Sequence, residues 1–101
     1  MIYMIVSEDN ESSLPLRAQA RPAHLARLEI LQQQGRLLLA GPNPAIDTEN
    51  PGEAGFSGSL IVARFDSLKA AREWAEQDPY VAAGVYHSVS VKPFRQVFPQ
   101  P

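Results

Sequence analysis

Two side chains of this chain, His24 and Asp78, are the candidates for acid–base chemistry. Histidine is the side chain that most readily exchanges a proton near neutral pH. A carboxylate beside one ring nitrogen fixes the tautomer and leaves the other nitrogen free to accept a proton from a ligand. We therefore expect Asp78 to face His24, and the pair to mark the chemistry of the protein.

Each member of this pair also has a purely structural explanation. His24 lies on the apolar arc of a predicted helix, between the directions of Leu28 and Leu31, where a histidine is more often a satisfied core residue than a catalyst. Asp78 precedes Pro79, which is typical of an N-cap followed by the first helical residue. One carboxylate oxygen can cap the helix while the other orients a histidine, so capping does not exclude catalysis.

Other residues are candidates for binding a ligand beside the pair. Arg21, one turn before the histidine, can bind an anionic group, although a solvated charge at a helix end explains it at least as well. The backbone around Gly41 and Pro42 and the hydroxyl group of Ser59 are candidate donors to developing negative charge. These positions define the expected binding site.

Three more side chains could do chemistry, but their sequence context supports a role in the site less strongly. Tyr80 and Tyr86 can line the pocket, and core packing with a wet hydroxyl explains each equally well. His87 shares a predicted strand face with three valines, so we expect it in an interface or the core. Two histidines with scattered carboxylates show no ligand spacing, and no metal site is predicted.

Composition narrows the class of protein. The chain has 101 residues, of which 45% are hydrophobic, so we expect one globular domain at 1–98 and a short tail at 99–101. The formal net charge of -2 is unlike that of a nucleic-acid binder. The absence of cysteine excludes disulfides and thiolate catalysis. No signal peptide or membrane span is predicted, so we expect a cytoplasmic protein without a membrane partner.

The hydrophobic pattern predicts four strands and two main helices. Strands are expected at 1–7, 36–40, 59–65 and 85–91, and helices between 14 and 34 and after Ser67, the expected N-cap of the second helix. Pro22 either kinks the first helix or begins its main part. A short helix follows Asp78 and ends at Gly84. Residues 92–98 can extend the last strand along a sheet edge, where Pro93 is tolerable.

The connection between residues 41 and 58 is long for so small a domain. It holds three prolines and four glycines and shows neither a helical nor a strand period. Such a segment is usually functional or mobile, and part of it can form a hairpin extension. The glycines at 52, 55 and 58 have no helix after them, so no phosphate-binding loop and no cofactor are predicted.

The order strand, helix, strand, strand, helix, strand is the ferredoxin-like βαββαβ pattern of an α+β domain with an antiparallel sheet. Two helices cover only one face of a four-stranded sheet, yet the first three predicted strands are apolar on both faces. The second face therefore needs a cover. We expect a homodimer in which the two sheets meet, with pockets near their rim.

Five motifs carry a resemblance to a known family: Arg21-Pro22-Ala23-His24-Leu25, Ala40-Gly41-Pro42, Gly55-Phe56-Ser57-Gly58-Ser59, Asp78-Pro79-Tyr80 and Ala83-Gly84-Val85-Tyr86. In their order and spacing they resemble the YciI-like (YCII-related) family of small bacterial proteins, over nearly the whole chain. The resemblance implies a dimeric α/β-barrel built from ferredoxin-like subunits, and an active site on His24 and Asp78. One branch of the family resembles enzymes that remove chloride from chlorinated hydroxyquinones with that dyad.

Two classes of function stay open. The first is a small lyase- or isomerase-like enzyme, in which His24 takes a proton from a hydroxyl or activated C–H of a small cyclic or aromatic substrate, anionic or phenolic in character. The second is a non-catalytic module that binds a small ligand or a protein. An RNA-binding domain is disfavoured because residues 59–65 lack interleaved stacking aromatics. A further hypothesis, a haem or flavin-free monooxygenase, is supported by fold analogy alone.

Overall fold

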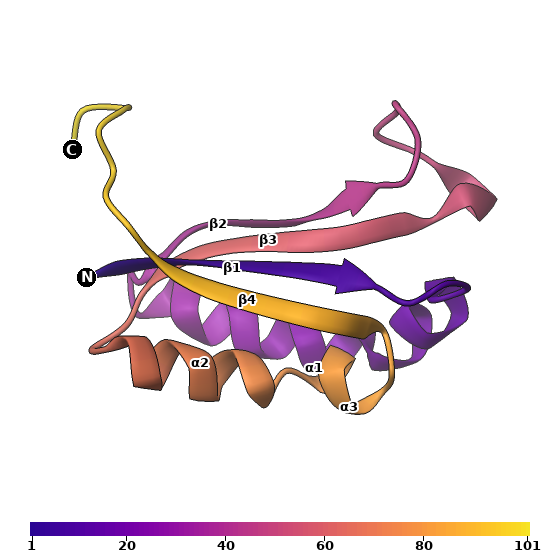
Figure 1. Cartoon of the computed structure of the whole chain (residues 1–101), viewed down its shortest axis with the longest axis horizontal. Coiled ribbons are helices and arrows are strands. Elements are labelled where there is room, and N and C mark those ends of the chain that lie inside the picture. Colours follow the sequence, from indigo (N-terminus) through magenta and orange to yellow (C-terminus); the bar gives the residue numbers. More distant parts are fainter.

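The chain forms one four-stranded antiparallel sheet with its helices on a single face, as Figure 1 shows for the computed structural model, which describes residues 1–101. The elements in chain order are β1 (Ile2–Asp9), α1 (Leu14–Gln33), β2 (Leu37–Pro44), a 3-10 turn (Gly52–Ala54), β3 (Phe56–Arg64), α2 (Leu68–Glu76), α3 (Pro79–Ala82) and β4 (Tyr86–Phe94). The strand order β2-β3-β1-β4 confirms the ferredoxin-like α+β fold.

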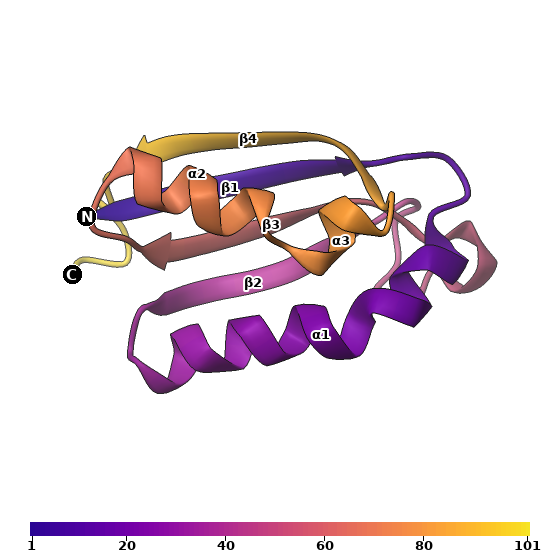
Figure 2. The ribbon, with the colours of Figure 1, turned by 90° about the horizontal axis from the view of Figure 1, so that it is seen from below.

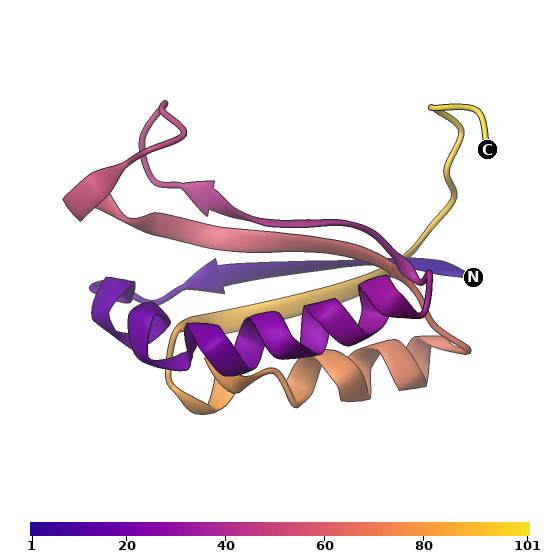
Figure 3. The same ribbon diagram turned by 180° about the vertical axis from the view of Figure 1, so that it is seen from behind.

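The helices lie side by side in one layer beneath the sheet. From below, α1 runs along β2, while α2 and α3 follow one another toward β4 (Figure 2). From behind, the other face of the sheet carries no helix, and only the β2–β3 hairpin and the C-terminal tail rise on that side (Figure 3). The molecule is therefore two-layered, with one covered and one open sheet face.

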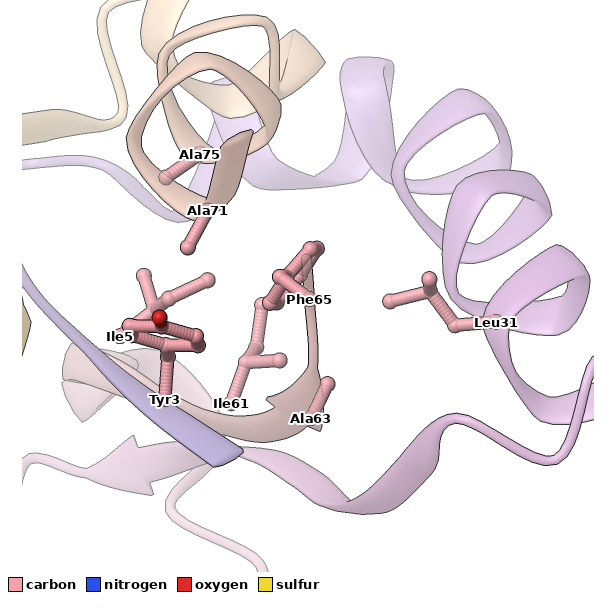
Figure 4. Close-up of a cluster of buried hydrophobic side chains, with 8 residues drawn as sticks. All are labelled: Tyr3, Ile5, Leu31, Ile61, Ala63, Phe65, Ala71 and Ala75. Carbon is pink, nitrogen blue, oxygen red and sulfur yellow. The ribbon is translucent and has the colours of Figure 1, made fainter. Parts of the chain in front are cut away.

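Buried apolar side chains fill the space between the sheet and the helices. The cluster in Figure 4 joins Tyr3, Ile5, Ile61, Ala63 and Phe65 from the sheet side to Ala71 and Ala75 of α2 and Leu31 of α1. The partners in register, Tyr3 with Ala63 and Ile5 with Ile61, bring these side chains to the same face of neighbouring strands. The small residues Ala71 and Ala75 allow α2 to approach the sheet closely.

The predicted helix boundaries are confirmed where a cap defines them. The Ser67 hydroxyl accepts a hydrogen bond from the Ala70 amide at 3.0 Å and begins α2. Asp78 accepts one from the Tyr80 amide at 2.9 Å and begins α3. Gly84 has φ +79° just after α3, a conformation that favours glycine because it has no side chain to clash.

Helix α1 continues from Leu14 to Gln33 with Pro22 inside it, so Pro22 does not begin its main part. Its buried residues are Arg17, His24 and Leu31. They are spaced by seven residues, which returns to nearly the same direction after two turns and places them in one row facing the protein. None of the helices combines the length and the apolar character needed to cross a bilayer.

The β2–β3 hairpin is longer than the strand pattern predicts. Strand β2 continues past Ala40 to Pro44, and β3 begins at Phe56 rather than at Ser59. Part of the connection expected at 41–58 is thus a hairpin extension. Its residues pair across the strands, yet the outer half of β2 is exposed, which explains why no hydrophobic period marks it.

A β-bulge near the start of β4 overturns the predicted alternation of its side chains. Glu8 pairs with Ser88, but the next residue, Asp9, pairs with Tyr86, so His87 is the extra residue. The bulge turns Tyr86 toward the helices, where it is buried beside Asp9. His87 is exposed and lies 3.6 Å from Glu8, so its expected place in the core is wrong for the single chain.

The open face of the sheet is apolar along its middle. Leu39 pairs with Val62, which also pairs with Met4, and Gly41 pairs with Leu60, so these side chains lie on the face away from the helices. A shallow depression there is lined by Met4, Leu38, Leu39, Leu60, Val62, Phe94, Gln96, Phe98 and Pro99. The sheet is thus apolar on both faces although helices cover only one of them, as the apolar residues on both sides of the first three predicted strands indicate.

Replacing Gly58 by alanine is expected to lower the free energy of unfolding by about 1–3 kcal/mol, the usual range for overpacking. A Cβ at this position would overlap the carbonyl oxygen of Ser7 in the adjacent strand. Gly41→Ala, also in a strand but with no atom within 4 Å of the added Cβ, serves as the control and should stay within about 0.5 kcal/mol. Urea unfolding measures the free energy of unfolding of both variants. Equal effects of the two variants would show that close packing against the Ser7 carbonyl does not require glycine at position 58.

Candidate functional site

A cavity of about 420 Å³ lies between α1 and the strands β2 and β3. Its walls are mostly apolar, and its lining residues are Leu14, Arg17, Ala18, Arg21, His24, Leu25, Leu28, Ala40, Gly41, Pro42, Phe56, Ser59, Ile61 and Tyr80. None of them is acidic, and the lining includes Arg21, whose charge has no carboxylate partner in the protein. The cavity therefore suits a small ligand with an apolar body and negative charge.

His24 and Asp78 meet at one end of this cavity, as expected. The Nδ1 atom of His24 lies 2.8 Å and 3.0 Å from the two carboxylate oxygens of Asp78, and both residues are buried. Because a carboxylate only accepts hydrogen bonds when ionised, Nδ1 must carry a proton. Nε2 has no hydrogen-bond partner in the protein. Nε2 is therefore the ring nitrogen that His24 leaves for a ligand in the cavity.

The carboxylate of Asp78 both caps helix α3 and binds the His24 ring, the two roles that the sequence suggests. Its Oδ1 atom accepts the Tyr80 amide at the start of α3 and also contacts His24. Asp78 itself does not line the cavity, whereas His24 does. The helix cap thus positions the carboxylate at Nδ1 of the imidazole, outside the cavity lining.

Tyr80 holds the imidazole ring from its flat side. The rings of His24 and Tyr80 are stacked, with centroids 3.9 Å apart and an angle of 9° between their planes. Tyr86 meets Tyr80 edge-on at 5.6 Å. Burial raises the pKa of Tyr80, and burial raises the pKa of Tyr86 to about 12, so both phenols stay neutral at ordinary pH.

A buried ion pair that sequence reasoning missed lies next to these rings. Arg17 donates from Nε and Nη2 to the two carboxylate oxygens of Asp9, at 2.6 Å and 2.9 Å. The side chains are only 7% and 2% exposed. Burial opposes the charged form of Arg17, but hydrogen bonds and charge from Asp9 outweigh it, so the pKa of Arg17 is raised. The heptad spacing from His24 was the signal available in the sequence.

Arg17 also connects the ion pair to the floor of the cavity. Its Nη2 atom donates to the Gly58 carbonyl and to the Ser59 hydroxyl, each at 3.0 Å. Its guanidinium lies 5.1–5.9 Å from the ring centroids of Phe56, Tyr80 and Tyr86, within cation–π range. A single residue thus contacts β1, β3, α3 and β4.

The remaining predicted binding residues fall into two groups. Arg21, Gly41, Pro42, Ser59 and Tyr80 all line the cavity, with Arg21 exposed. Tyr86 does not line it; its hydroxyl donates to Ser59 Oγ at 2.9 Å from behind the cavity wall. Phe56, which the sequence did not single out, adds an aromatic wall from the first residue of β3. No group of three or more potential metal ligands converges anywhere in the chain.

Comparison with known proteins places this geometry in context. A model of the YCII-related domain matches residues 1–95. The chain is 59% identical over 98 residues to protein YciI of Escherichia coli, covering 97% of this chain and 100% of that protein. It is 58% identical over 98 residues, with the same coverage of both chains, to an uncharacterized protein of Haemophilus influenzae.

Among the solved structures that the chain resembles is one that is similar in both fold and sequence. It is a 5-chloro-2-hydroxyhydroquinone dehydrochlorinase from Burkholderia phenoliruptrix, in complex with 2,5-dihydroxybenzoquinone. The TM-score is 0.82 at 26% identity, and the alignment covers 94% of each chain.

Neutralising Asp9 should destabilise the protein strongly. Asp9→Asn leaves the buried guanidinium of Arg17 without its counter-charge, and breaking a buried pair from one side costs about 3–5 kcal/mol. Glu73→Gln is the control, because Glu73 lies 3.9 Å from Lys69 on the surface, and such a pair contributes about 0.3–0.5 kcal/mol. Chemical unfolding compares them. If Asp9→Asn costs no more than Glu73→Gln, the pair does not hold the site together.

Proposed function

The chain belongs to the YCII-related domain family, and from this premise we propose that it is a small enzyme in which His24 and Asp78 act as an acid–base dyad. Its substrate is a small cyclic or aromatic molecule that carries an ionisable hydroxyl group. The reaction is of the lyase or isomerase kind and begins with removal of a proton by His24.

The observation that carries the proposal is that the two nitrogens of the His24 ring have different surroundings. Both oxygens of Asp78 lie within 3.0 Å of Nδ1, and Nε2 is left without a partner beside the cavity. Nε2 is not sealed in the core, because Arg27 Nη1 is the buried side-chain nitrogen without a partner, so the unpaired nitrogen of His24 is open to a ligand in the cavity that His24 lines. A carboxylate at Nδ1 also stabilises the imidazolium that forms when Nε2 takes a proton.

The proposed step uses only the side chains of this protein. Nε2 of His24 accepts the proton of a ring hydroxyl, and the electron pair of the broken O–H bond moves into the ring as an enolate. Return of the proton from the imidazolium to a ring carbon makes that carbon tetrahedral and completes an isomerisation. Where that carbon carries an anionic leaving group, Nε2 takes a second proton from another ring hydroxyl, the electron pair of that O–H bond forms a carbonyl, and the leaving group departs with its own electron pair, which completes an elimination. In both cases protons and electrons balance without an oxidant or a reductant.

The cavity and the structural neighbour support this class of substrate. Apolar walls from α1 and β3 suit a flat ring, and Arg21 favours a ligand that becomes negative, whereas the charge of Arg17 is already paired with Asp9. The similar dehydrochlorinase is known with 2,5-dihydroxybenzoquinone bound, which is a small ring bearing hydroxyl and carbonyl oxygens. We extend this ligand chemistry, but no particular substrate, to the present chain.

We further propose that the protein is a homodimer formed through the open face of the sheet. Leu39 and Phe94 on that face are 53% and 40% exposed, and Phe98 of the tail beside them is 76% exposed. An apolar sheet face of this kind is unstable in water, and a second copy of the same face covers it symmetrically.

Two substitutions test the dyad. His24→Ala is expected to lower turnover by about 10²–10⁴-fold, the usual contribution of a general base. Asp78→Asn should also lower turnover while keeping the fold, because asparagine caps a helix as well as aspartate does. A panel of ring-hydroxylated compounds, including 5-chloro-2-hydroxyhydroquinone, is screened first by thermal shift and then for product formation.

The second histidine provides the control for this experiment. His87 is exposed, lies outside the cavity, and its replacement by alanine should leave turnover unchanged. Full activity of Asp78→Asn would show that the dyad is wrong. Ligand binding by the wild-type protein without any turnover would favour a non-catalytic binding module.

The dimer is tested by placing a charge on the open face. Leu39→Glu should convert the dimer to a monomer, as measured by sedimentation or light scattering, because the carboxylate would be buried between the sheets. Ile30→Glu is the matched control, since Ile30 is equally exposed at 53% but lies on α1. A monomeric wild-type protein, or dissociation by both variants alike, would contradict the proposed interface.

A further inference from the structure

We propose that the hydroxyl group of Ser59 is a fixed hydrogen-bond donor for an oxygen anion of the ligand. This inference rests on the proposed function, because it names the group that binds the negative charge created when His24 removes a proton. Ser59 reaches the cavity from β3, whereas His24 reaches it from α1. Donor and acceptor therefore come from different walls.

The hydrogen bonds around Ser59 direct its hydroxyl proton toward the cavity. Its Oγ atom accepts from Arg17 Nη2 at 3.0 Å and from the Tyr86 hydroxyl at 2.9 Å. A serine hydroxyl has two acceptor lone pairs and one proton, so both lone pairs are occupied. No acceptor in the protein takes the proton of Ser59. The group is 5% exposed, and the accessible space next to it is the cavity.

The two residues that donate to Ser59 are themselves held in place. Arg17 is bound by both oxygens of Asp9, and its charge polarises the Ser59 hydroxyl, which strengthens the hydrogen bond that Ser59 can donate. Tyr86 is turned toward Ser59 by the bulge in β4. With a pKa raised by burial to about 12, the phenol keeps the proton that it donates.

This arrangement selects for ligands with two conjugated oxygens. The first, a hydroxyl, gives its proton to His24 Nε2. The second must carry the resulting negative charge, because only an acceptor can satisfy the Ser59 proton. A ring in which a hydroxyl is conjugated with a carbonyl meets both conditions, because its anion shares the negative charge between the two oxygens. Such conjugated enolates are the ligand class that we assign to the cavity.

Binding of 2,5-dihydroxybenzoquinone to Ser59→Ala tests the assignment. A hydrogen bond to a charged group contributes enough to weaken binding by about 10- to 100-fold when it is removed. Isothermal titration calorimetry at neutral pH measures this loss. Ser57→Ala is the control, since Ser57 lies two residues away on β3, is exposed and does not line the cavity. Affinity of Ser59→Ala within twofold of wild type would overturn the proposal, as would absence of binding by the wild-type protein.

A second variant covers the case in which Ser59→Ala does not fold. Tyr86→Phe keeps the Ser59 hydroxyl but frees one of its lone pairs, so the proton is no longer held toward the ligand. We expect weaker binding of the same quinone by a few-fold, in a protein that still melts cooperatively. Unchanged affinity in Tyr86→Phe would show that the orientation of Ser59 does not matter and would overturn the assignment.

Turnover by His24→Ala separates this inference from the proposed function. Weak binding by Ser59→Ala together with full turnover by His24→Ala would support the donor and refute the dyad. Loss of turnover in His24→Ala, with wild-type binding by Ser59→Ala, would support the dyad and refute the donor.

Discussion

The buried ion pair between Arg17 and Asp9 is the interaction on which the arrangement around the cavity depends. It joins the end of β1 to the first turns of α1, and Arg17 extends it to Ser59 on β3 and to the ring of Tyr80 on α3. Tyr80 in turn supports the imidazole of His24 by stacking. A charge this deeply buried is tolerated only when its partners satisfy it, so the four elements are held in one relative position.

Asp78 illustrates how one side chain can serve fold and site together. Its N-cap bond begins a helix of four residues, which is too short to be stable by itself. That helix carries Tyr80, the ring that stacks on His24, while the same carboxylate orients the imidazole. The local cap and the long-range contact thus support each other, and the structural and functional explanations of Asp78 are compatible.

Two of the three irregular features of the sheet lie near the site, and the third lies between Leu37 and Leu39 at the start of β2. The bulge at His87 turns Tyr86 inward, and a second register shift near Asn43 accompanies the hairpin beside Phe56. Bulges re-aim side chains at the cost of regular pairing, and here they add two aromatic rings around Arg17. The middle of the sheet is regular because it serves the core on one face and carries apolar side chains on the other.

The sequence by itself determined the features that depend on neighbours a few residues apart. Strand and helix order, the caps at Ser67 and Asp78, the stop at Gly84 and the apolar character of both sheet faces follow from local periodicity and capping. The family resemblance added His24 and Asp78 as partners. Only the tertiary structure revealed the Arg17–Asp9 pair and its link to Ser59, and only it placed Tyr86 and His87 on their proper sides. Ser59 lies 42 residues from Arg17 in the chain, and a one-residue bulge reverses the side of every residue beyond it. Contacts of this kind depend on which strands pair and in what register, and no local pattern records that choice.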